Sequence, residues 1–289
     1  MMWAKRHRYL GRLLHGLALS VMLLGAARLN LRPQTWAPQV SSDAVALAPE
    51  EASAQALPDF GAILDIETKK RTFFEFLQPI VDAQNLRVSR QRIKLLKISA
   101  KVDEHTPLSP QDQIFLRALL RTYEVNTEHF DSPEALKLLL LRVDVLPPSL
   151  VLAQAANESA WGTSRFAREG YSFFGQWCYR EGCGLVPEQR NASAYYEVQS
   201  FSSIEASVDA YFLNLNTFDR YNELRQIRQG LRDHRAPIDG LSLAEGLSDY
   251  SGRGQAYIRE LRQMIRDNNL LRHDYAEAEA ATVATTGVY

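Results

Sequence analysis

The feature that most constrains the fold is a short helical run that is apolar on nearly every face. Pro147 and Pro148 end the preceding helix, and the run Ser149-Leu-Val-Leu-Ala-Gln-Ala-Ala-Asn-Glu158 then begins a new one. Residues 150–156 offer almost no polar surface, so this helix must be buried among other elements. The fold therefore has to surround residues 149–158 with further secondary structure.

Most of the remaining chain has helical periodicity. Residues 69–83 and 88–102 predict two amphipathic helices. Ser-Pro pairs at 109–110 and 132–133 each supply a capping oxygen and a first helical residue that needs no amide partner. They predict helices through Tyr123 and over 136–143. Glu205 follows Ser202 by three positions, which is a capping box for a helix through Asn214.

The interval 172–199 departs from this pattern. It is rich in aromatic residues and glycine, and residues 194–198 alternate in polarity. We expect a β-hairpin or a long excursion here, which is usually a functional feature. The predicted fold class is mainly α (α+β), with a small β-hairpin excursion.

The amino terminus has the pattern of an export signal. Lys5, Arg6 and Arg8 precede a mostly apolar run over 13–27. This run of about 15 residues is shorter than the roughly 20 of a membrane span, which favours a cleaved signal over an anchor. A buried helix of the domain is the alternative, but the basic and Pro-bearing flanks disfavour it. We expect a periplasmic or cell-envelope location, with membrane anchoring through the N-terminus as the alternative.

Composition and cysteine content narrow the class of protein further. The chain has 33 Lys plus Arg against 34 Asp plus Glu among 289 residues, so its net charge provides no long-range attraction to the phosphates of nucleic acid. We therefore expect no nucleic-acid partner. Cys178 and Cys183 are close enough to form a disulfide in an oxidising compartment, and two unpaired thiols are the alternative. The histidines are scattered, so we expect no metal site and no cofactor.

Glu158 stands at the end of the apolar helix, one turn from Trp161. The negative end of the helix dipole and an apolar environment both disfavour ionisation, so this carboxyl should hold its proton more tightly than in water. A raised pKa is what a general acid needs to protonate a leaving oxygen near neutral pH. The alternative is a structural Glu that forms an ion pair with Arg165 or Arg168.

The segment around Glu158 also resembles a known family. Leu152-Ala-Gln-Ala-Ala-Asn-Glu-Ser-Ala-Trp-Gly162, followed by Phe173-Phe-Gly-Gln-Trp177, resembles the signature of bacterial endo-β-N-acetylglucosaminidases of glycoside hydrolase family 73. Residues 178–187 and Tyr250-Ser-Gly-Arg-Gly254 with Tyr257 look most like its Bax-type subgroup. The resemblance covers roughly residues 135–272.

This resemblance implies a lysozyme-like helical domain that hydrolyses β-1,4 bonds after N-acetylglucosamine in peptidoglycan. Glu158 occupies the general-acid position, and Tyr250 falls where the family has a Tyr near the cleft. A muramidase or lytic transglycosylase on the same fold, or a non-catalytic wall-binding module, are the alternatives.

A glycosidase usually pairs two carboxylates. Glu197 is the natural second candidate, and Glu181 and Glu188 compete with it. Alternatively, the 2-acetamido group of the substrate supplies its own carbonyl as nucleophile, and Tyr250 then steers that carbonyl or stabilises the transition state.

Aromatic rings offer flat apolar faces to sugars. We expect a glycan-binding surface built from Trp161, Phe174, Gln176, Trp177, Tyr195, Tyr196 and Tyr257. Core packing is the competing interpretation for Trp161, Tyr250 and Tyr257, and Trp177 is the better candidate for a ligand face.

The predicted organisation has five parts: a signal peptide or anchor (1–32), a disordered linker (33–59), an N-terminal helical segment (60–134), the glucosaminidase-like domain (135–272) and a disordered tail (273–289). The expected partner is the glycan strand of peptidoglycan.

Overall fold

The computed structural model describes residues 56–191 and 194–274. The predicted signal or anchor, most of the predicted linker and nearly all of the predicted tail lie outside these described residues. Of the helices within the described ranges, none is both long enough and apolar enough to cross a membrane.

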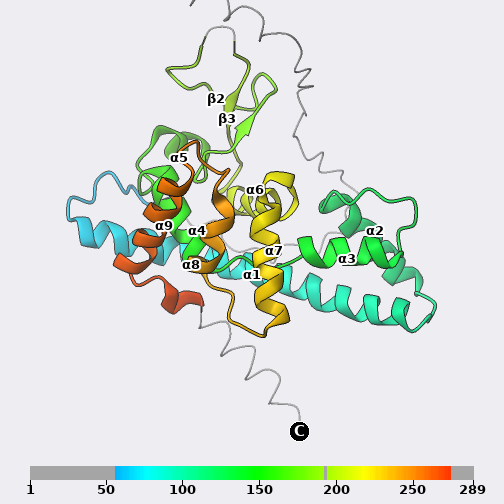
Figure 1. The fold of residues 1–289 in the computed structure, drawn as a ribbon. Helices are drawn as coiled ribbons and strands as arrows, with labels where there is room; N and C mark the ends of the chain where they lie inside the picture. The colour runs from blue at the N-terminus through cyan, green and yellow to red at the C-terminus, as the bar shows by residue number, and fades with distance from the viewer. Residues whose placement is uncertain (1–55, 192–193, 275–289) are drawn as a thin grey trace, which may run out of the picture. The chain divides into compact units, whose positions relative to one another are not determined.

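The described residues are mainly helical, with three short strands (Figure 1). The helices are α1 (Ile66–Asp103), α2 (Pro110–Thr122), α3 (Pro133–Arg142), α4 (Pro148–Ser159), α5 (Arg165–Gly170), α6 (Ile204–Thr217), α7 (Asn222–Asp233), α8 (Gly240–Leu243) and α9 (Gln255–Asp267), with 3-10 turns at Asp219–Tyr221 and Ala244–Leu247. The strands β1 (Trp177–Cys178), β2 (Gly184–Leu185) and β3 (Glu197–Gln199) form an antiparallel sheet in the order β1-β3-β2. The mainly α prediction with a small β element is confirmed, although the excursion is a three-stranded sheet rather than a simple hairpin.

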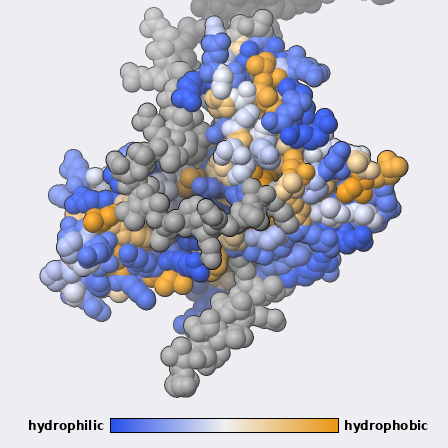
Figure 2. Space-filling view, turned by 180° about the vertical axis from the view of Figure 1, so that it is seen from behind, coloured by the Kyte–Doolittle hydropathy of each residue, from blue (hydrophilic) through white to orange (hydrophobic). Residues whose placement is uncertain are grey.

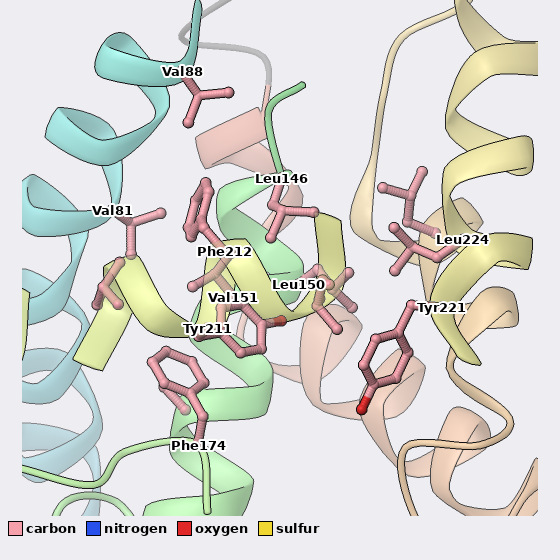
Figure 3. Packing of buried hydrophobic residues seen from close by; sticks show 14 of the residues in the cluster. Val81, Val88, Leu146, Leu150, Val151, Phe174, Tyr211, Phe212, Tyr221 and Leu224 are labelled. Carbon is pink, nitrogen blue, oxygen red and sulfur yellow. The ribbon is translucent and has the colours of Figure 1, made fainter. Parts of the chain in front are cut away.

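Helix α4 lies inside the helical body, as its apolar circumference predicts. It contacts α1, α8 and α9. Leu150, Val151 and Leu152 have no exposed surface. Figure 3 shows Leu150 and Val151 among Tyr211 and Phe212 of α6, within one continuous hydrophobic core.

The predicted helix starts are largely confirmed. Ser109 and Ser132 cap α2 and α3, and each accepts a backbone N–H three residues on. The cap of α6 is Ser203, whose Oγ accepts from the amide of Ala206, so the prediction of Ser202 was wrong by one residue. Glu205 lies in the first turn of α6, where a negative charge interacts favourably with the helix dipole.

One helix, α1, replaces the two helices predicted over 69–83 and 88–102. It runs for 38 residues and contains Pro79. A proline removes one hydrogen bond inside a helix, but burial on both sides of it outweighs that loss. Leu77 and Val81 flank Pro79 with no exposed surface, and Val88 and Leu95 continue the buried face. Because α1 contacts α3, α4 and α6, residues 60–134 share the core of the rest of the chain.

The chain stays ordered past the predicted start of the tail at residue 273, which was therefore too early. A last helical turn covers residues 271–274. The Asp274 carboxylate accepts from the backbone N–H and hydroxyl of Ser149, at 2.8 and 2.6 Å, and from the amide of Gly240 at 3.1 Å. Asp274 thereby caps the first turn of α4 from a distant part of the chain.

The face of the molecule seen in Figure 2 is largely hydrophilic where described residues are visible. Figure 2 shows hydrophobic residues in small groups among polar ones on the face opposite to Figure 1. Several of the exposed large hydrophobic side chains belong to the β region: Trp177, Tyr179, Val186 and Tyr195.

Candidate active site

The turn after α4 fixes the position of Glu158. Ala160, Trp161 and Gly162 all have positive φ, at 50°, 59° and 74°. The helix thus ends at a left-handed Ala160. Gly162 is still required, because a Cβ there would lie 2.3 Å from the ring of Phe60. A side chain from the segment before α1 therefore packs directly beneath the end of α4.

The Glu158 carboxyl is partly buried and has one strong hydrogen-bond donor. The Tyr257 hydroxyl donates to Oε1 at 2.7 Å, and the Asn157 amide approaches the same oxygen at 3.4 Å. Oε2 lies beside Gly175, where a Cβ would be 3.7 Å from that oxygen. Burial raises the pKa of Glu158, and the hydrogen bonds from Tyr257 and Asn157 and the charge of Arg253 offset this only in part. The carboxyl has the raised pKa that a general acid needs.

Of the two arginines predicted as alternative partners of Glu158, Arg165 is engaged elsewhere. Arg165 lies 3.7 Å from Glu169 one turn along α5, and donates to the carbonyl of Val186 at 2.7 Å. The charged neighbours that act on the Glu158 pKa are Arg253 and Glu260 instead.

Behind Tyr257 lies a chain of buried hydrogen bonds. The Gln154 side-chain amide donates to the Tyr257 hydroxyl oxygen at 2.9 Å, and the Tyr211 hydroxyl donates to the Gln154 carbonyl oxygen. Gln154 is one turn before Glu158 on α4, Tyr211 is on α6 and Tyr257 is on α9. Three helices therefore converge on one carboxyl oxygen.

Tyr250 contacts this series of hydrogen bonds through the ring of Tyr257. Its ring stacks on Tyr257, with centroids 5.5 Å apart and planes at 6°. Its hydroxyl donates to the backbone carbonyl of Phe174 at 2.9 Å. This arrangement places Tyr250 close to the Glu158 site, and its catalytic role stays a prediction.

Glu197 sits in a different environment, in strand β3. Its Oε1 accepts from the amide of Gly182 at 3.1 Å, and its Oε2 accepts from the amide of Gly184 at 2.8 Å. These two backbone donors lower the pKa of Glu197. Both oxygens hold the loop between β1 and β2, which is a structural task, and the proposed second catalytic role stays a prediction.

Cys178 and Cys183 form a disulfide that closes this same loop, so the predicted pairing is present. Their sulfur atoms and a Glu197 oxygen lie within 4.8 Å of one another, a spacing that suits metal ligands. Because the two sulfurs are bonded to each other, the cluster offers only one carboxylate as a ligand.

The β region carries an exposed aromatic surface. Trp177 is 52% exposed and stacks on Tyr196, with ring centroids 4.5 Å apart and planes at 9°. Tyr195 is 82% exposed. Of these predicted sugar contacts, Trp177 and Tyr195 are accessible to a ligand, and Tyr196 is half-buried.

The other predicted sugar contacts lie in or against the core. Phe174 is buried and stacks on Tyr211 at 3.9 Å, so the prediction that it binds sugar was wrong. Gln176 is buried and donates to the carbonyl of Ala210, and Tyr257 is 1% exposed. Trp161 packs edge-on against Phe73 and Phe74 of α1. The sequence alone did not separate these residues from the exposed ones, because contacts with distant elements bury them.

Three residues near Glu158 were missed by the sequence analysis: Gln154, Gly175 and Tyr211. Gln154 had a detectable signal, since it is a polar side chain in the middle of an apolar helix and must find buried partners. Nothing local distinguished Tyr211 from a core aromatic residue. Gly175 has a φ of 61°, a conformation that its neighbours in sequence do not reveal.

Comparison with known proteins identifies the family of the chain. The family model described as mannosyl-glycoprotein endo-beta-N-acetylglucosaminidase matches residues 134–270, which include Glu158, Glu197 and Tyr257. The chain belongs to this glucosaminidase family. A curated relative is protein bax of Escherichia coli (strain K12), 30% identical over 220 residues, which span 76% of this chain and 77% of that protein. No solved structure matches the chain.

Proposed function

We propose that this protein is a peptidoglycan hydrolase that cleaves β-1,4 bonds after N-acetylglucosamine, with Glu158 as general acid. The observation that carries the proposal is the state of the Glu158 carboxyl: burial raises its pKa, and Gly175 leaves room beside Oε2. Membership of the glucosaminidase family supports a glycan substrate.

In the first step, the proton of Glu158 passes to the glycosidic oxygen as the bond from that oxygen to the anomeric carbon breaks. The resulting carboxylate keeps the hydrogen bond from Tyr257 and gains from the charge of Arg253. The sugar is left as an oxocarbenium-like centre that requires a nucleophile.

For that nucleophile, we favour the carbonyl of the substrate's own 2-acetamido group over Glu197. Glu197 uses both oxygens to accept loop amides, and moving it onto a sugar would leave those amides without acceptors. Water then opens the cyclic intermediate, and the Glu158 carboxylate takes the proton of that water. This returns the acid to its starting state.

The stacked pair Trp177 and Tyr196 is suited to hold a sugar ring of the strand. The exposed indole face of Trp177 can pack against the C–H face of a pyranose, while the polar edges of the stacked pair can contact its hydroxyl groups.

We also propose that the protein acts in the periplasm or cell envelope, exported by residues 1–32. The Cys178–Cys183 disulfide supports this location, because structural disulfides persist in oxidising compartments. Sequencing the mature N-terminus from cell fractions tests it, and an uncut, cytosolic protein would contradict it.

Glu158→Gln tests the proposed chemistry. Because Gln cannot donate a carboxyl proton, release of reducing ends from purified peptidoglycan should fall by about 10²- to 10⁴-fold. Glu169→Gln, an exposed Glu paired with Arg165 on α5, is the matched control and should retain activity. Unchanged turnover of Glu158→Gln would refute the proposal, and mass spectrometry of wild-type products should find N-acetylglucosamine, not muramic or anhydromuramic acid, at the new ends.

A further inference from the structure

The hydrogen bonds behind Glu158 have a defined direction. The Tyr211 hydroxyl donates to the Gln154 carbonyl oxygen, which commits the Gln154 NH₂ group to the other side. That NH₂ donates to the Tyr257 oxygen at 2.9 Å, so the Tyr257 proton points to Glu158 Oε1, 2.7 Å away. Gln154 and Tyr257 thus each receive one hydrogen bond and give one along the chain.

Burial protects this direction from competition with water. Tyr211 and Gln154 have no exposed surface, and Tyr257 is 1% exposed. Reversing one bond would place two donors or two acceptors face to face unless the whole chain reversed. In a water-excluded setting such a mismatch leaves buried polar groups without partners and is strongly disfavoured.

We infer that Tyr211, Gln154 and Tyr257 form a positioning chain that fills Oε1 of Glu158, so that the acidic proton is carried on Oε2 and delivered on the side of Gly175. The inference rests on the proposed role of Glu158 as general acid. A carboxyl oxygen that already accepts the Tyr257 proton is the poorer place for a second proton, so the free oxygen is protonated.

Gly175 provides the matching opening. It has no side chain and a φ of 61°, and even the single methyl group of an alanine would lie in contact with Oε2, at 3.7 Å. The Tyr250–Phe174 hydrogen bond anchors the backbone immediately before it. A glycosidic oxygen can therefore approach Oε2 over the glycine, where a larger residue would narrow the approach.

The ionisable groups around the carboxyl are few. Arg253, two residues before α9, and Glu260, in the second turn of α9, act on its pKa, and Tyr257, Tyr250 and Tyr211 lie around it as neutral phenols. The Tyr257 hydrogen bond lowers the pKa of Glu158, because it favours the carboxylate. Removing that donor must raise the pKa if Oε2 carries the proton. If the hydrogen bonds ran in the opposite direction, Oε1 would carry the proton and donate it to the Tyr257 oxygen. Removal of the Tyr257 hydroxyl would then lower the pKa of Glu158.

The experiment measures the Glu158 pKa directly by NMR of protein carrying ¹³C-labelled glutamate side chains, with Glu158→Gln used to assign the signal. In Tyr257→Phe we expect the pKa to move upward, and the alkaline limb of kcat/KM to move upward with it. Tyr123→Phe is the matched control, because Tyr123 is a buried tyrosine whose hydroxyl donates to Gln91 instead. A downward or absent shift in Tyr257→Phe overturns the inference.

Tyr211→Phe tests the far end of the chain without touching Glu158. It should move the Glu158 pKa in the same direction as Tyr257→Phe, by less. No movement removes Tyr211 from the positioning chain.

Gly175→Ala tests the direction of delivery. It should lower kcat/KM on peptidoglycan without a downward shift in the Glu158 pKa. Gly182→Ala is the control for backbone strain, because Gly182 has a φ of 77° and no atom lies within 4 Å of the added Cβ. Thermal unfolding should show a similar loss of stability in both variants. Full activity of Gly175→Ala would refute delivery over Gly175.

The failure of the inference and that of the proposed function give different results. If Tyr257→Phe raises the Glu158 pKa by NMR while the pH profile of hydrolysis stays in place, the hydrogen-bond chain stands and Glu158 is not the acid. If hydrolysis requires Glu158 but Tyr257→Phe lowers the Glu158 pKa, Glu158 is still the general acid and its proton lies on Oε1.

Discussion

The end of α4 and the β region each hold a shielded carboxylate, and the two respond to folding in opposite ways. Glu158 receives one phenol hydrogen bond and lies against packed helices, and its pKa rises. Glu197 is 4% exposed, receives two backbone amides, and has a lowered pKa. Exclusion of solvent alone does not set the proton affinity. The donors and the depth of the surrounding protein decide together.

Asp274 shows whether hydrogen-bond donors or depth of burial has the larger effect on a carboxyl pKa when both are present. It accepts two amides and one hydroxyl, yet burial and, to a smaller extent, the charge of Asp239 raise its pKa to about 6. Glu197 lies beneath a single loop of a thin sheet, whereas Asp274 lies between α4 and α8. Depth in the helical body therefore outweighs even three donors.

The largest expected effect on stability comes from Asp274. Its pKa in the folded state exceeds the ordinary value of 3.8, so its stabilisation is present at low pH and lost as the pH rises through about 6. The difference in the free energy of unfolding between wild type and Asp274→Asn should therefore decrease by at most about 3 kcal/mol from pH 4 to pH 7. Urea denaturation across this range measures it. A difference that is independent of pH would show that donors, and not depth, control Asp274.

A smaller effect is expected from opening the disulfide. The double variant Cys178→Ser, Cys183→Ser should lower the free energy of unfolding by about 2 kcal/mol, from the entropy of the short loop that the bond closes. It should also raise the pKa of Glu197, because Gly182 and Gly184 lose their fixed positions. Denaturation and NMR titration measure both. The Glu158 pKa serves as an internal control and should stay constant.

The smallest effect is expected for Glu197→Gln, which keeps the shape of the side chain. Because folding lowers the Glu197 pKa, its stabilisation is present above the ordinary value of 4.5 and is lost as the pH falls through the lowered value. The drop in thermal midpoint should therefore be larger at pH 7 than at pH 3. If Glu197→Gln instead lost as much hydrolysis as Glu158→Gln at an unchanged midpoint, Glu197 would be catalytic and the contrast between the two carboxylates would fail.

Local signals in the sequence were enough for part of this description. Ser109 and Ser132 bind amides three residues away, so the positions of α2 and α3 follow from the adjacent residues. Burial of α4 follows from its own composition, and the raised Glu158 pKa follows from that burial.

The rest depends on contacts between distant residues. Tyr257 and Glu158 are 99 positions apart, and Tyr211 and Gln154 are 57 apart, so only tertiary packing brings them together. The same packing buried Phe174, which looks like an exposed aromatic residue in the sequence. The continuity of α1 past Pro79 was likewise decided by the core on both sides of it.

The continuity of α1 determines whether residues 134–270, which match the family model, can be expressed alone. With 38 residues, α1 is about 57 Å long and supplies one wall of the interior that residues 134–270 alone do not complete. Phe73 stacks on Phe173 and contacts Trp161, and Phe60 fills the space that Gly162 leaves. Excising residues 134–270 would expose these buried aromatic side chains to water, so we expect this segment to require α1 for stable expression.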